Sequence, residues 1–288
     1  MVRQILLVTE GVSEGDLLKK LFNRFCSEKV EIVEFKTNIY QLYDCYESYH
    51  CRYDQLDLRK VLLEHCTRLK SSEKERLKKN FSEIYLIFDM DPQDPLYSRE
   101  KLIKLHSHFS DPSDYGKLYI NYPMVESFYH IEKGCYREGI SDVNFSNSKF
   151  SVKNLSCYKK NVSEEGFRIF NANPPSLIAR AIQQHIDKFK LIEKITLVDA
   201  EITHKELESF LKKQCSMVVD EQRGYILNTS CFAISELYPK KLAEALRKLF
   251  KSTLNNRLHR NLACVIDKNS RGAKLERAFE ELPQKINS

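Results

Sequence analysis

The chain has 288 residues, with 46 Lys or Arg against 40 Asp or Glu, and 42% of its residues are hydrophobic. This composition is ordinary for a folded protein with a core, and the length suits one large domain or two small ones. No run of about 18 apolar residues occurs, which argues against a membrane span. No G-x-x-x-x-G-K-[ST] motif occurs, which excludes a Walker-type ATPase at the motif level.

The start of the chain and its cysteines both predict a cytoplasmic protein. The first residues hold only a six-residue apolar stretch and no small-residue cleavage site, which indicates a strand rather than a signal peptide. Nine cysteines occur, an odd number, and no pair forms C-x-x-C, so we expect free thiols. A zinc site built from Cys45, His50, Cys51, His65 and Cys66 is an alternative, although their spacing matches no common zinc finger.

The charge is unevenly distributed along the chain. Residues 1–150 contain 22 basic and 24 acidic residues, whereas residues 151–288 contain 24 and 16. The excess is concentrated in 240–277, which has eleven Lys or Arg and three acidic residues. This asymmetry indicates a division of labour, in which acids hold a metal and bases bind a polyanion. A solvated helical surface that is merely basic explains the same numbers, so charge alone leaves both interpretations open.

The first 80 residues predict an α/β unit followed by a helical excursion. Gln4–Thr9 is a continuous apolar run typical of a central, parallel strand. A helix is expected after Ser13 as its N-cap, and Val30–Phe35 is the next strand. Residues 38–80 predict helices, because tyrosines at 40, 43, 46, 49 and 53 and apolar residues in Leu58–Leu69 recur at helical spacing. Packing is the default role of the tyrosines, and base stacking is the alternative.

Two further strands are predicted before a linker. Ile84–Phe88 is the strongest buried-strand signal, Lys101–Phe109 predicts a helix, and Lys117–Tyr122 predicts a strand. Gly139–Ser151 is rich in Ser, Asn and Asp and predicts a linker. Beyond it the pattern is mainly helical, with a capping box at Thr203-x-x-Glu206. We therefore predict an α/β domain over 1–138, with a helical insertion at about 38–80, and a mainly helical basic domain over 151–288.

Four acidic residues each follow a predicted strand: Glu10, Asp89, Asp91 and Glu126. In an open α/β sheet, ligands bind at the carboxyl ends of the strands, so these side chains converge if the strands are parallel. Clustered carboxylates repel one another unless a cation is present, and Mg²⁺ prefers oxygen ligands. Each acid by itself is equally consistent with a helix cap, a turn or a surface position. Their order and common position predict a metal site with all four as ligands.

These residues resemble the TOPRIM fold, which topoisomerases, primases, OLD-family nucleases and small RloB-like proteins share. The resemblance consists of Glu10-Gly11 after a first strand and Asp89-x-Asp91 after a long apolar strand. The segment 121–128 is similar to the Asn-Pro-x-x-Glu element of RloB-like proteins, with a tyrosine between Asn121 and Pro123. The resemblance covers about residues 3–135 and implies a TOPRIM-like, mostly parallel sheet flanked by helices.

The resemblance also implies a chemistry, namely cleavage of phosphodiester bonds in RNA (tRNA included) or DNA with Mg²⁺ or Mn²⁺. Glu10 would act as general acid/base or ligand, and Asp89, Asp91 and Glu126 would hold the ion. Lys153 and Lys159 would offset negative charge that develops on the phosphate, although both also suit ordinary surface positions.

Among TOPRIM proteins, the chain most resembles a nuclease. No tyrosine among its fifteen stands out as a topoisomerase nucleophile, and a primase would add a zinc module. A TOPRIM unit with a basic helical companion is similar to the toxic effectors of bacterial anti-phage defence, which implies a separately encoded ATPase partner. The alternative is a non-catalytic module that binds nucleic acid or an acidic protein through the basic C-terminal region. Whether the chain forms a homo-oligomer is left open.

Overall fold

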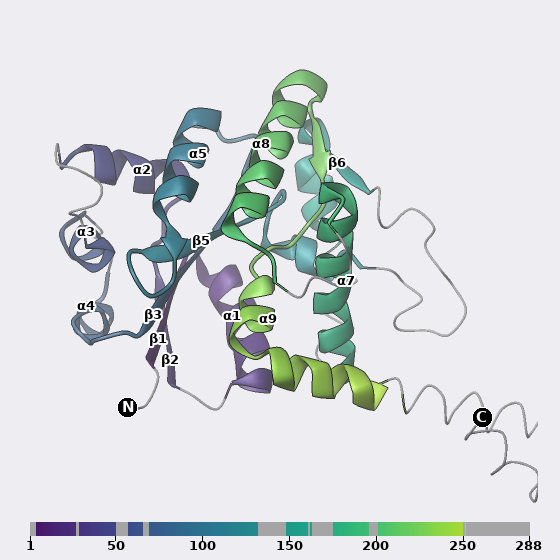
Figure 1. The fold of residues 1–288 in the computed structure, drawn as a ribbon. Coiled ribbons are helices and arrows are strands. Elements are labelled where there is room, and N and C mark those ends of the chain that lie inside the picture. Colours follow the sequence, from purple (N-terminus) through teal and green to yellow (C-terminus); the bar gives the residue numbers. More distant parts are fainter. Residues whose placement is uncertain are drawn as a thin grey trace, which may run out of the picture.

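The computed structural model describes residues 4–26, 29–49, 57–65, 69–131, 148–160, 162, 175–195, 201–249 and 251. Its centre is a five-stranded sheet in the order β2-β1-β3-β5-β4 (Figure 1). The strands are β1 (Gln4–Thr9), β2 (Lys29–Glu34), β3 (Glu83–Asp89), β4 (Ser110–Asp111) and β5 (Gly116–Asn121). All neighbouring pairs are parallel except β4 with β5. The predicted α/β class with a mostly parallel sheet is therefore confirmed.

The central strands are apolar along their whole length because both faces of the sheet are covered. In β1 every residue after Gln4 is buried, and in β3 every residue after Glu83 is buried. Helix α1 (Val12–Phe25) connects β1 to its parallel neighbour β2 and packs its apolar stripe on the sheet. This is the βαβ arrangement that a continuous apolar strand followed by a helical stripe predicts.

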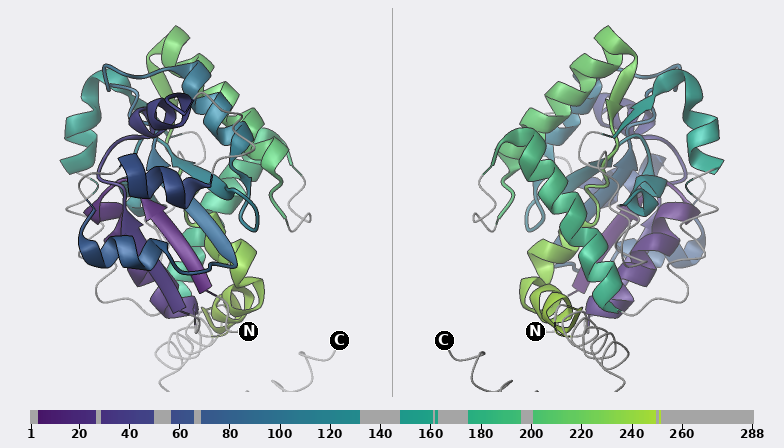
Figure 2. Two further views of the ribbon diagram at one scale, coloured as in Figure 1. Left: turned by 90° about the vertical axis from the view of Figure 1, so that its left-hand side faces the viewer. Right: turned by 90° about the vertical axis from the view of Figure 1, so that its right-hand side faces the viewer.

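Helices lie on both faces of the sheet. On one side are α2 (Ile39–Glu47), α3 (Leu58–His65), α4 (Ser71–Leu77) and α5 (Arg99–His108), and on the other are α1, α7 (Pro175–Glu193) and α9 (Phe232–Leu237). The long helix α8 (His204–Glu221) contacts both α5 and α7. Figure 2 shows the two helical layers in turn, with α2–α4 in front of the strands in its left view.

Residues from the second half of the chain complete the environment of β5. Strands β6 (Lys149–Ser151) and β7 (Arg223–Tyr225) form a small antiparallel sheet. The segment after β7 then runs beside the end of β5, where Tyr122 and Leu227 exchange two backbone hydrogen bonds of 2.8 Å. One hydrophobic cluster contains residues from the sheet and from α7, α8 and α9. The predicted division into domains 1–138 and 151–288 stays a prediction.

Within the predicted helical stretch 38–80, the described residues form α2, α3 and α4. Tyr40 and Tyr46 are buried, and Tyr43 and Tyr49 are partly buried against the core, which supports the packing role of this stripe. Tyr53 lies outside the described residues.

Two predicted boundaries are wrong in detail. The expected linker includes Lys149–Ser151, which forms β6 because Phe150 packs into the core beside Gly224. The helix predicted over Leu58–Leu69 covers Leu58–His65, and Leu69 itself is not helical. Glu126 lies in a short 3-10 helix, η2 (Val125–Tyr129). Within the described ranges, no helix combines the length and the apolar character that crossing a membrane requires.

Candidate metal centre

The four predicted carboxylates lie at one edge of the sheet. Glu10 follows β1 directly, Asp89 is the last residue of β3, and Asp91 comes two residues later. Glu126 lies in η2, which follows β5. Because β1, β3 and β5 are adjacent and parallel, their carboxyl ends meet at this edge. In addition to its burial, the charges of the other three acids raise the pKa of Asp89, so all four belong to one electrostatic cluster.

Hydrogen bonds hold the innermost carboxylates in place. The backbone N–H of Asp89 donates to Glu10 Oε2 over 3.3 Å, so β3 positions the carboxylate that follows β1. Asn121 Nδ2 donates to Asp89 Oδ1 over 3.3 Å. The other amide atom of Asn121, Oδ1, accepts from the Ser230 N–H over 3.2 Å. Asn121 therefore links the cluster to the segment after β7, a contact between residues 109 apart in sequence.

Asp91 is one of the few non-glycine residues with a left-handed backbone, at φ 41°. Asp tolerates this region better than most residues, and such conformations are frequent where a chain turns at a functional site. The Asp91 N–H donates to the Pro123 carbonyl over 3.3 Å, and its carbonyl accepts from the Asp94 N–H over 2.9 Å. The turn therefore keeps Asp91 next to the chain that leaves β5.

Burial and repulsion by neighbouring acids raise the pKa of Glu10, Asp89 and Asp91. Burial raises the pKa of Glu10 to about 8, with further contributions from Asp91 and Glu14. The pKa of Asp89 lies well above its usual value, first through burial and then through its acidic neighbours. Burial is also the main reason why the pKa of Asp91 is raised. Ionising all of them together costs free energy unless a cation is close.

Sequence reasoning missed a fifth carboxylate, Glu14. We expected Ser13 to cap α1, but the helix begins at Val12 with Gly11 as N-cap, and the Gly11 N–H donates to Glu14 Oε2 over 2.8 Å. Glu14 is buried and its pKa is raised, first by burial and also by the charge of Glu126. Its position four residues after Glu10, in the first helical turn, was the available signal.

A lysine from the second half of the chain reaches the cluster. Lys159, in the helix over 155–160, places its Nζ 3.1 Å from Glu126 Oε1. Burial alone would lower the pKa of Lys159, but Glu126, Asp89 and Glu14 raise it above its usual value. Lys153 is exposed in the 3-10 turn Val152–Asn154, and its predicted role stays a prediction.

An open cleft of about 620 Å³ gives access to part of the cluster. Its acidic lining residues are Glu10, Glu14, Glu34, Asp91 and Asp94, and its only basic one is Lys36. Clefts of about 300–1,000 Å³ are the size class that holds small ligands. The cleft is therefore suited to a cation and to the single phosphate that this cation binds.

The carboxylate oxygens of this cluster are the type of ligand that hard divalent cations prefer. As the side chains stand, no group of three or more Asp, Glu, His or Cys residues in the described ranges is arranged to hold a metal ion. The carboxylates are turned instead toward the N–H groups of Asp89 and Gly11 and toward Lys159. However, Glu126 Oε2 is buried and has no hydrogen-bond partner in the described part of the chain. A buried carboxylate oxygen without a partner among the described residues, close to further carboxylates, is chemically suited to a hard cation such as Mg²⁺ or Mn²⁺.

Two other predictions lie largely outside the described residues. His50, Cys51 and Cys66 of the alternative zinc site are not described, and neither is most of the basic stretch 240–277. The described helix over 239–249 lies near the start of β1, at the opposite end of the sheet from the carboxylates (Figure 1). No protein-family model matches this chain, and neither a curated protein nor a solved structure does.

Proposed function

We propose that this protein is a metal-dependent nuclease that hydrolyses phosphodiester bonds with Mg²⁺ or Mn²⁺. The observation that carries the proposal is a set of five carboxylates at the carboxyl edge of the sheet. Glu14, Asp89 and Glu126 are buried, and burial together with neighbouring acids raises the pKa of Glu10, Glu14, Asp89 and Asp91. The parallel order β2-β1-β3-β5, with Glu-Gly after β1 and Asp-x-Asp at the end of β3, supports a TOPRIM-like interpretation.

Each residue has a role that its position supports. Asp89, Asp91 and Glu126 would hold the ion, and Glu14 would add a ligand. When bound, the ion polarises the scissile phosphate and lowers the pKa of a coordinated water. Glu10, with a pKa of about 8, can hold or release a proton near neutral pH, which suits a general acid/base.

Lys159 places a positive charge beside the carboxylates. Its partly exposed head contacts Glu126 and can turn toward a phosphate oxygen, where it would offset negative charge. By resemblance we also propose that the nuclease is a toxic effector of anti-phage defence that works with a separately encoded ATPase.

The test is a cleavage assay on tRNA, single-stranded DNA and plasmid, with Mg²⁺, Mn²⁺ or EDTA. Because Glu10→Gln removes the proton-transfer group and keeps its shape, cleavage should fall at least about 100-fold. Glu75→Gln is the matched control. Glu75 is exposed on α4, and within the described residues its one ion pair is with Lys78, which is exposed as well. Cleavage that persists in EDTA, or equal rates for Glu10→Gln and wild type, would contradict the proposal.

A further inference from the structure

The acidic cleft by itself poses a problem for a nucleic-acid substrate. Five of its lining residues are carboxylic acids and one is a lysine. A bound ion can attract one phosphate into such a cleft, but the neighbouring phosphates of the same strand would be repelled by the remaining carboxylates. Proteins bind these flanking phosphates with Lys and Arg. The strand therefore needs cations immediately beside the cleft.

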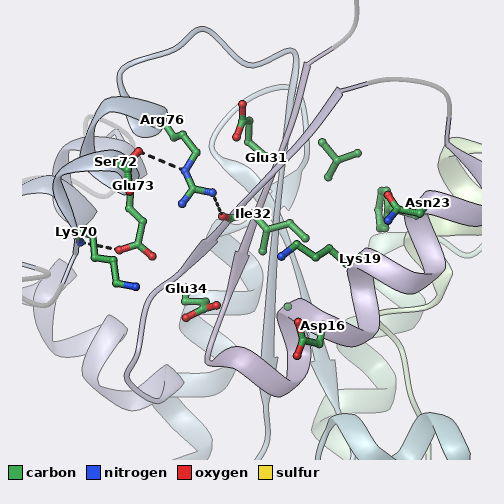
Figure 3. Close-up of a pocket in the computed structure, with 13 residues that line it drawn as sticks. Asp16, Lys19, Asn23, Glu31, Ile32, Glu34, Lys70, Ser72, Glu73 and Arg76 are labelled. Atoms are coloured by element: carbon green, nitrogen blue, oxygen red, sulfur yellow. Dashed lines mark hydrogen bonds between the residues drawn. The ribbon is translucent and has the colours of Figure 1, made fainter. Parts of the chain in front are cut away.

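A second cleft, of about 390 Å³, adjoins the first beside the edge strand β2 (Figure 3). Glu34, at the carboxyl end of β2, lines both clefts. Lys36 lines the first cleft, and its Nζ lies 3.4 Å from Glu73 Oε2, which belongs to the second. The two clefts are therefore neighbours along β2, and we call the second one, which lies between α1 and α4, the β2 groove.

Three cationic side chains line the β2 groove, and the guanidinium of Arg76 also donates to the carbonyls of Ser72 (3.3 Å) and Ile32 (3.0 Å). Lys19 reaches it from α1, and Lys70 and Arg76 reach it from the start and the body of α4 (Figure 3). In the described part of the chain none of the three pairs with a carboxylate side chain. Lys19 and Lys70 are also exposed to solvent.

Two of the four acids that line the β2 groove are paired with lysines. Glu31 pairs with Lys79 at 2.8 Å, and Glu73 pairs with Lys36. The other two, Glu34 and Asp16, lie toward the carboxyl edge, since Glu34 ends β2 and Asp16 lies near the start of α1. Charge therefore changes along the two clefts from acidic at the candidate metal centre to basic beside the middle of β2.

We propose that the β2 groove binds the backbone of a single nucleic-acid strand next to the scissile phosphate, with Lys19, Lys70 and Arg76 as phosphate contacts. This inference rests on the proposed nuclease function and assigns the path of its substrate. The proposed strand runs from the carboxylates into the space between α1 and α4, and away from the basic helix over 239–249. RNA and DNA share the phosphate chemistry, and separate binding measurements distinguish them.

The experiment measures binding of fluorescein-labelled single-stranded 12-mers of RNA and of DNA to the full chain, by anisotropy at several salt concentrations. Wild type is measured in EDTA, and Glu10→Gln is measured with Mg²⁺. The double variant Lys19→Gln/Lys70→Gln should bind on the order of tenfold more weakly. It should also lower the slope of log affinity against log salt by about 1.4, or about 0.7 for each lost phosphate contact.

Two matched variants make the result specific. Lys19→Arg/Lys70→Arg keeps both charges and should restore the affinity and the salt slope. Lys240→Gln/Lys248→Gln removes the same charge from exposed positions of the helix over 239–249 and should leave both unchanged. Wild-type affinity and slope in the Lys19/Lys70 double variant, or an equal loss in the Lys240/Lys248 variant, would overturn the proposed strand path.

The outcome for the β2 groove is separable from the outcome for the nuclease. Metal-dependent cleavage combined with normal binding by Lys19→Gln/Lys70→Gln would overturn the groove alone. A wild-type protein that cleaves none of the substrates, but whose 12-mer binding depends on these two lysines, would overturn the nuclease and support the groove as a strand-binding site.

Discussion

At the scale of single residues, the site is defined by charges that are buried close together. Asp89 is the clearest case, because it is buried at the end of β3 and the charges of Glu10, Glu14, Asp91 and Glu126 all raise its pKa. A raised pKa means that the folded protein binds a proton that the unfolded chain has released. Stability therefore falls as pH rises above the usual range of a carboxyl group.

Asp89→Asn tests this conclusion without an activity assay. The amide keeps an oxygen that can accept from Asn121 Nδ2 and removes the buried charge. In EDTA at pH 8 we expect Tm to rise by about 2–4 °C, corresponding to about 1 kcal/mol in a domain of this size. Mg²⁺ should raise Tm of the wild type, since it binds only the folded state, and should leave Asp89→Asn unchanged. A lower Tm in EDTA, or equal Mg²⁺ shifts in both proteins, would contradict a cation site at Asp89.

At the scale of elements, two helices carry buried neutral histidines into the core. His106 of α5 stacks on His204 at the start of α8, with ring centroids 4.4 Å apart. Burial, followed by His204, Lys117 and Lys212, lowers the pKa of His106 to about 3. His185 of α7 is fully buried between the Phe128 carbonyl and the Asn228 N–H, and burial lowers its pKa to about 3.

These histidines predict a loss of stability in mild acid. Each folded-state pKa is depressed, so the unfolded chain binds a proton below pH 6.5 that the folded protein does not. The stability that each neutral histidine contributes to the folded protein is fully present above pH 6.5. It is lost as pH falls toward 3, by up to about 1.4 kcal/mol per pH unit for each histidine. His106→Phe keeps the ring stack. In urea unfolding between pH 7 and 4.5, it should reduce the pH dependence of the free energy of unfolding by the contribution of one proton, about 1.4 kcal/mol per pH unit. An unchanged slope would contradict the neutral state of His106.

At the scale of the whole molecule, the two halves of the chain share one core. Thr229 Oγ1 donates to the Ile120 carbonyl over 2.7 Å, and Asn228 Nδ2 donates to the Val125 carbonyl over 3.2 Å. The segment after β7 is therefore hydrogen-bonded to both β5 and η2. Helices α7 and α9 also pack on α1. The element that carries Glu126 thus depends on residues from the far end of the described chain.

This packing predicts that residues 1–138 do not fold alone. Without α7 and α9, one face of α1 would be exposed, and the Ile120 and Val125 carbonyls would lose their partners. We expect the fragment to show helical far-ultraviolet circular dichroism with no cooperative thermal transition. A cooperative transition with a Tm near that of the full chain would instead support a division into independent domains.

The local pattern of the sequence was sufficient for the central strands and for the positions of four of the five carboxylates at the candidate site. Strands β1, β3 and β5 are long apolar runs that end in polar residues, so their parallel edge and the placement of Glu10, Asp89, Asp91 and Glu126 could be predicted from order alone. Glu14 was missed because a glutamate in the first turn of a helix is ordinary, and only its burial distinguishes it.

Contacts between distant segments were decided by tertiary structure. The pairing of Lys159 with Glu126, the bond from Ser230 to Asn121 and the position of Glu34 between the two clefts each depend on how separate elements pack. Hydrophobic periodicity reports which face of an element is buried, but it does not report which partner buries it. For this reason the residue types and their strand-end positions could be read from the chain, whereas the charge balance of the site became visible only in the folded protein.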